Sequence, residues 1–234
     1  MSEQNHARMQ GTALGFLAGY VDTLGFVALA GLFTAHVTGN FILIGASLAD
    51  AGHPSILLKL LAFPAFIAGV ALARMVVVVV EGRGGAPLRP ALLLQLVLLL
   101  GFMGFGIAAS PMGQHAGVLG TLAGIMGAAS MGVHSAASRL LLGHLAPTSM
   151  MTGNVTQIVI DLVDALRGSS DPGLKGRCAK FMWPLAAFTA GCIAAAFAFH
   201  WFGFAALVVP VLILLGLLVA EAPSPAGQKQ ASAS

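Results

Sequence analysis

Long apolar runs separated by short polar stretches are the main pattern of this 234-residue chain. Eight apolar segments lie at about 12–32, 36–50, 56–80, 88–109, 117–142, 150–166, 181–200 and 203–220. They show no alternation of polar and apolar residues, and they are longer than the roughly ten residues of a membrane β-strand. A helix satisfies every backbone N–H and C=O within its own segment, as hydrocarbon requires. The pattern therefore predicts an all-α, polytopic bundle of transmembrane helices.

Two of the eight segments differ from the others. Segment 36–50 has about 15 residues, whereas a bilayer needs about 20, and segment 150–166 carries Asp161 and Asp164 in its second half. If all eight segments cross the membrane, seven Lys and Arg residues lie on one face of the membrane and four on the other. If these two enter and return on the same side, the division is ten to one. The positive-inside rule favours six spans plus two shorter helical segments, with both termini in the cytoplasm. Full crossing stays an alternative, because re-entrant segments are uncommon.

Composition supports a membrane protein and excludes several functions. The chain is 58% hydrophobic and 8% charged, with a mean hydropathy of +0.93, whereas about a quarter of the residues of a soluble protein are charged. The net charge of +3 does not form a basic stripe, so we expect no nucleic-acid partner. Walker, HExxH and GxSxG motifs are absent, and the two cysteines match no metal spacing. We therefore expect no enzymatic activity, cofactor or metal site.

The tripeptide Thr-Gly-Asn occurs twice, in AHVTGNFI at 35–42 and in SMMTGNVT at 149–156. Similar stretches precede the two copies, GYVDTLGFVALAG and GVHSAASRLLLGH, and a pair of apolar segments follows each. With small gaps, this predicts two related membrane repeats, 12–110 and 114–220, between a polar cytoplasmic N-terminus (1–11) and a disordered tail (221–234). Secondary transporters contain such repeats, parallel or inverted, and bind substrate where the repeats meet.

The two tripeptides have two interpretations. Each supplies a Thr hydroxyl, a Gly with few backbone restrictions and an Asn amide. They are either helix breaks that face each other and line a polar cavity, or caps of helix starts at the membrane surface. The residues concerned are Thr38, Gly39, Asn40, Thr152, Gly153 and Asn154.

Asp22 lies about ten residues into the first segment, near the middle of the membrane. A charge there is costly and usually faces the bundle interior or water. Asp22 is either a proton- or cation-coupling group or a protonated or paired residue that ties two helices together. His36 and His134 are either proton shuttles or hydrogen-bonded packing residues. Three further polar residues complete the candidate substrate or ion site: Tyr20, Ser135 and Gln157.

The stretches GYVDTLGFVALAGLFTAHVTGN and PTSMMTGNVTQ resemble the YoaK-like bacterial integral membrane proteins, a family classed as a domain of unknown function. The resemblance covers about 12–220. Where that family often has Gln-Asn followed by Ala, this chain has His134 and Ser135 before Ala136. The resemblance implies a multi-pass protein of the bacterial inner membrane and gives no established reaction or substrate.

We therefore expect a secondary permease for an unidentified small solute, with proton coupling through Asp22 as one option. The alternative is a non-transporting membrane protein that binds lipid or a partner protein. Besides the lipid bilayer and the solute, we consider a second copy of the chain as a partner. A water-accessible cavity that reaches Asp22 and Asn40 would favour the permease, whereas sealed side chains would favour the alternative.

Overall fold

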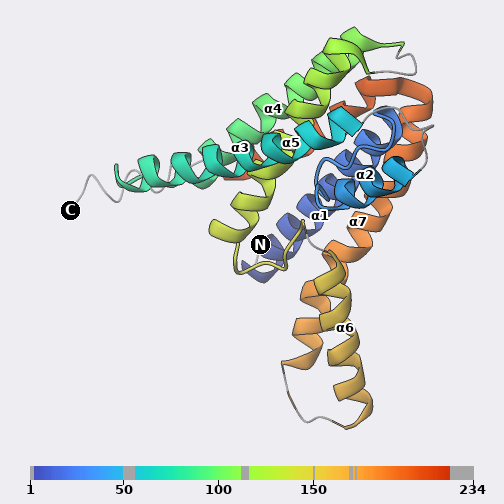
Figure 1. Ribbon diagram of the computed structural model, residues 1–234. Helices are drawn as coiled ribbons and strands as arrows, with labels where there is room; N and C mark the ends of the chain where they lie inside the picture. Colours follow the sequence, from blue (N-terminus) through green and yellow to red (C-terminus); the bar gives the residue numbers. More distant parts are fainter. Residues whose placement is uncertain are drawn as a thin grey trace.

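The computed structural model describes residues 3–49, 56–111, 116–149, 151–168, 171 and 173–221. Within this part of the chain every regular element is helical, as predicted (Figure 1). The elements are α1 (Glu3–Ala28), α2 (Gly39–Ala49), α3 (Ile56–Glu81), α4 (Leu88–Ala109), α5 (Gly117–Leu140), α6 (Met151–Leu166), α7 (Leu174–Phe202), the 3₁₀ helix η1 (Gly203–Leu207) and α8 (Val208–Ala220).

The predicted segments agree closely with the helices, except at some ends. The polar residues before segments 12–32 and 181–200 continue the helices, so α1 begins at Glu3 and α7 at Leu174. Helix α1 ends at Ala28, four residues before the predicted end. The chain turns there, and Ala30 and Gly31 both take positive φ values, 51° and 79°. The predicted tail, apart from Glu221, lies outside the described residues.

Among the described residues, five stretches are long and apolar enough to cross a membrane. Four are α1, α3, α4 and α5. The fifth, Gly176–Ala220, contains α7, η1 and α8, so it holds the last two predicted spans. Helix α2 has 11 residues and α6 has 16. At about 1.5 Å per residue, neither covers the roughly 30 Å of a hydrocarbon core. The prediction that the Thr-Gly-Asn segments form shorter helices is confirmed.

Large apolar side chains cover much of the outer surface. Ile42, Leu57, Val97 and Leu212 are each at least 60% exposed, and they come from four different helices. Soluble monomers rarely expose continuous apolar patches, whereas lipid-facing helices must. The chain is a multi-pass membrane protein.

Helix α1 packs along α7, although the two are far apart in the sequence (Figure 1). Glycines allow this close approach: a side-chain carbon at Gly19 would collide with the Phe188 carbonyl, and one at Gly191 with the Phe16 carbonyl. Small residues commonly let transmembrane helices pack backbone to backbone.

Helices α3 and α5 pack in a corresponding way. A side-chain carbon at Gly69 would collide with the Ala129 carbonyl, and one at Gly132 with the Phe66 carbonyl. Helix α4 lies against the other side of α5. These two close helix pairs support the segments that surround the candidate site.

We expect Gly191→Ala and Gly69→Ala each to lower the free energy of unfolding by about 1–3 kcal/mol, because the added methyl group forces the paired backbones apart. Gly216→Ala is the matched control. It is exposed in α8 with no atom within 4 Å of the added carbon, and alanine there favours the helix. Denaturant unfolding in detergent measures the difference. Equal stability of the three variants would contradict the close packing.

Candidate functional site

A cavity of about 560 Å³ lies where the two Thr-Gly-Asn stretches meet. Its walls come from the connection before α2, from α3 and α5, and from the start of α6. Phe66, Val70 and Met151 give it an apolar side. Its polar lining consists of His36, Thr38, Ser135, Arg139, Ser149 and Thr152. A few polar groups on a largely apolar wall are typical of small-molecule sites.

Asp22 lies behind this cavity, on α1, and is 4% exposed. Its Oδ1 accepts hydrogen bonds from the backbone N–H groups of Thr34 and Ala35, both at 2.7 Å, and from the Thr34 hydroxyl at 3.2 Å. Its Oδ2 lies 2.6 Å from Nδ1 of His36. The carboxylate thus holds the connection between α1 and α2 against α1, and these contacts compensate for its burial.

His36 connects this buried carboxylate with the cavity. Its side chain is 38% exposed and lies outside the spanning helices. The rings of Phe33 and Phe188 contact it edge-on, with centroids 6.3 and 5.9 Å away. The hydrogen bond to Asp22 raises the pKa of His36 above its usual value. Asp22 therefore reaches the cavity through His36 and not directly.

The two Asn residues shape the connections and do not line the cavity. Asn40 donates from Nδ2 to the Phe33 carbonyl at 2.8 Å, and its Oδ1 accepts from the Phe33 N–H at 3.0 Å. Asn154 donates from Nδ2 to the Pro147 carbonyl at 2.8 Å. Each amide thus bonds to the residue seven positions earlier, and both are 1% exposed. They close the turns that bring Thr38 and Thr152 to the cavity.

Of the two interpretations of the tripeptides, the structure agrees with the helix starts and not with the helix breaks. Gly39 and Gly153 lie in the first turns of α2 and α6, and neither is among the described glycines with positive φ. The tripeptides therefore begin short helices instead of breaking long ones. Gly153 contributes to the cavity wall, whereas Gly39 faces the ring of Phe33.

A second polar network lies on the α4 side of the cavity wall. His134 is 2% exposed, with Nδ1 3.2 Å from the Gln95 amide nitrogen and Nε2 3.0 Å from the Thr148 hydroxyl. Next to it, the hydroxyls of Ser135 and Ser149 are 3.2 Å apart at the cavity surface. His134 thus joins α5 to α4 and to the connection before α6, and it does not itself line the cavity.

Comparison with known sequences places the chain in a family. A family model described as "Protein of unknown function (DUF1275)" matches residues 10–220. The chain belongs to the DUF1275 family. It is also 25% identical over 214 residues to "UPF0700 transmembrane protein YoaK" of Bacillus subtilis (strain 168), which covers 91% of this chain and 92% of that relative. The expected YoaK-like resemblance is therefore confirmed. No solved structure matches.

In this DUF1275 chain, five of the twelve predicted site residues line the cavity: His36, Thr38, Ser135, Thr152 and Gly153. Two others lie away from it. The Tyr20 hydroxyl donates to the Ala206 carbonyl at 3.0 Å in the core, and Gln157 donates to Asp161 at 3.0 Å farther along α6. Among the described residues, no group of three or more His, Cys, Asp or Glu side chains is placed to hold a metal ion.

The predicted site lacked two polar or charged lining residues, Ser149 and Arg139. Ser149 is the first residue of the stretch SMMTGNVT, and a hydroxyl so close to Thr152 was a signal that could have identified it. For Arg139, near the end of segment 117–142, the sequence leaves two interpretations open: a side chain that reaches the lipid headgroups, or a binding partner for an anionic solute. Arg139 lies four residues after Ser135, so both share one face of α5, and that face forms the cavity wall of this DUF1275 protein.

Proposed function

We propose that this DUF1275 protein is a secondary permease and that the cavity between the Thr-Gly-Asn elements binds its small solute. The observation that carries the proposal is that both elements, 114 residues apart in the sequence, contribute to one polar cavity. Its volume of about 560 Å³ suits a small molecule. His36 and Arg139 are the titratable or charged groups on its described wall, so the cavity favours a polar or anionic solute.

The helix pairing supports two related halves. Gly19 and Gly132 are 113 residues apart, and the carbonyls that they face, on Phe188 and Phe66, are 122 residues apart. The first helix of each half thus crosses the third helix of the other half, as expected for two repeats related by an approximate two-fold axis. Transporters built from repeats bind their substrates where the repeats meet, and the cavity lies between elements of both halves.

We further propose that the coupling ion is a proton and that Asp22 and His36 carry it. At the offset of 113 residues that relates Gly19 to Gly132, the corresponding positions are Ser135 and Ser149, whose hydroxyls cannot exchange a proton near neutral pH. Of these two pairs, Asp22 and His36 are therefore the one that can take up and release a proton. Because Asp22 is buried, His36 relays the proton between the carboxylate and the cavity.

One observation favours the alternative of a non-transporting protein. Asp22 and Asn40 are 4% and 1% exposed, and their hydrogen bonds hold the connection before α2. In that case the polar groups serve folding, and the cavity opens to one side of the membrane only. Access from both sides therefore distinguishes the two functions.

Thiol labelling tests the permease without knowledge of the solute. We expect Thr38→Cys and Thr152→Cys, in a background with Cys178 and Cys192 changed to Ser, to react with a membrane-impermeant maleimide from either side of the membrane. Right-side-out and inside-out vesicles provide the two sides. Ala128→Cys is the control, because Ala128 is fully buried and stays unlabelled.

Labelling of both positions from one face only would support the alternative. The same vesicles test the proposed location, a bacterial inner membrane with cytoplasmic termini, through a cysteine added after Ser234. That cysteine reacts in inside-out vesicles only.

A further inference from the structure

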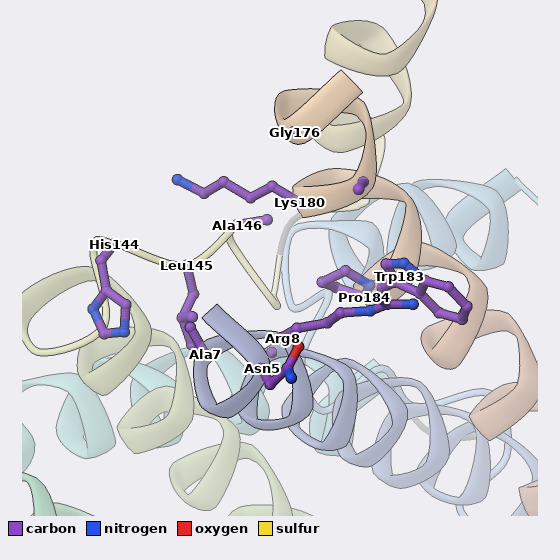
Figure 2. A pocket seen from close by; sticks show the side chains of 12 residues that line it. Asn5, Ala7, Arg8, His144, Leu145, Ala146, Gly176, Lys180, Trp183 and Pro184 are labelled. Carbon is purple, nitrogen blue, oxygen red and sulfur yellow. The ribbon is translucent and has the colours of Figure 1, made fainter. Parts of the chain in front are cut away.

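A second pocket lies away from this cavity, at the N-terminal ends of α1 and α7 (Figure 2). Its volume is about 410 Å³, and Arg8, His144, Lys180 and Trp183 are among its lining residues. Figure 2 shows Arg8 extending from α1 towards the Trp183 ring, while Lys180 extends towards the side of the pocket where His144 lies. The pocket thus carries two permanent positive charges.

Among the described residues, no carboxylate pairs with these two charges. The Arg8 Cζ lies 3.9 Å from the centroid of the Trp183 ring, a contact that orients the guanidinium and leaves its N–H groups able to donate. Neither Arg8 nor Lys180 forms an ion pair with a described carboxylate, and none of the lining residues is acidic. The nearby Glu221 contacts His6 and Gln10, which do not line the pocket. The pocket is therefore suited to an anion.

An apolar groove of about 590 Å³ continues from this pocket. The two share Asn5, Arg8 and Trp183. From there the groove follows α1, α7 and α8 past Phe16, Ala187 and Ile213. Phe16 lies eight residues beyond Arg8, about 12 Å along the helix. The cationic and apolar parts are thus arranged like the headgroup and the acyl chain of a lipid.

We propose that this pocket and groove bind one anionic phospholipid, with the phosphate at Arg8 and Lys180 and an acyl chain in the groove. A soluble phosphate matches the cations equally well but has nothing to place against Phe16 and Ile213. Trp183 is 43% exposed and belongs to a residue type that favours the headgroup region. Basic pockets between transmembrane helices recognise anionic headgroups by the same chemistry.

Fluorescence of Trp183 in a Trp201→Phe background, and the lipid count in native mass spectrometry, test the proposal on the full chain in nonionic detergent. We expect dioleoyl phosphatidylglycerol to bind at least about fivefold more tightly than dioleoyl phosphatidylcholine, and Arg8→Gln or Lys180→Gln each to weaken it about fivefold. Arg83→Gln is the matched control, because Arg83 is an exposed cation in the turn after α3 and should leave the affinity unchanged.

A second pair of measurements distinguishes a lipid from a free anion. Ala187→Phe fills the groove, so we expect it to weaken dioleoyl phosphatidylglycerol while leaving the short-chain dihexanoyl lipid unchanged. Inorganic phosphate at millimolar concentration should not displace the long-chain lipid. Equal affinity for both headgroups, displacement by phosphate, or a Lys180→Gln affinity equal to that of Arg83→Gln would each overturn the proposal. If Arg8→Gln does not fold, Lys180→Gln and Ala187→Phe still decide it.

Discussion

Replacing Asp22 by Ala should lower the free energy of unfolding by about 3–5 kcal/mol, the usual cost of removing one partner from a buried charged network. The substitution leaves the N–H groups of Thr34 and Ala35 without their acceptor, and it removes the partner of His36. Chemical denaturation in detergent measures the loss. Asp164→Ala is the control, because Asp164 is exposed on α6. Equal losses for the two variants would show that Asp22 does not hold the connection.

Asp22→Asn separates this structural role from the proposed proton coupling. Asn keeps an oxygen that accepts the two N–H groups, but it carries no charge and takes up no proton. We expect it to fold and insert, to abolish the pH dependence of solute uptake, and to remove the part of the pH dependence of labelling at Thr38→Cys that exceeds the ordinary ionisation of a thiol. An Asp22→Asn protein with the pH dependence of the wild type would rule out coupling through Asp22.

The raised pKa of His36 gives this comparison a defined pH window. A raised pKa means that the folded protein holds the proton more tightly, so the stabilisation is complete below the unfolded value of about 6.5. It is lost as the pH rises through the folded value. The stability difference between the wild type and Asp22→Asn should therefore shrink as the pH rises above about 6.5.

Asn40→Ala should lower the free energy of unfolding by about 2–4 kcal/mol, and Asn154→Ala by about 1–2 kcal/mol. Asn40 bonds both backbone groups of Phe33, whereas Asn154 bonds one described backbone group, the Pro147 carbonyl, together with the weakly accepting Met151 sulfur, and each buried group without a partner costs about 1–3 kcal/mol. Asn5→Ala is the control, since Asn5 is exposed. Thermal unfolding ranks the variants by stability. If Asn40→Ala unfolds at the same temperature as the wild type, the amide does not close the turn.

The helices could be predicted from the sequence because apolar runs of membrane length leave few alternatives. Predicted segment 88–109 coincides with α4, and the shortness of α2 and α6 followed from residue counts and charges. A cavity lined by both Thr-Gly-Asn elements was one of the two interpretations of the sequence, since polar residues repeated in an apolar setting require polar surroundings.

The hydrogen-bond partners could not be predicted in the same way. Asn40 and Asn154 bond to irregular backbone seven residues earlier, which no helical spacing indicates. The Tyr20 hydroxyl bonds to the Ala206 carbonyl, 186 residues away, so its role depends on how α1 meets η1. The position of Arg139 near the end of α5 is typical of a cation at a helix end. The sequence does not show that the start of α6 lines the same cavity.

The packing of α1 on helices far along the chain affects how the protein is made. Within the described part of the chain, α1 packs on α5, α7, α8 and η1, and on no helix of residues 29–109. During synthesis α1 enters the bilayer well over a hundred residues before α7 leaves the ribosome. Until then its glycine face can contact only lipid or the insertion machinery. The packing of α1 is therefore complete only after residues 117–220 have been translated, and a chain that stops after α4 leaves α1 without these helix partners.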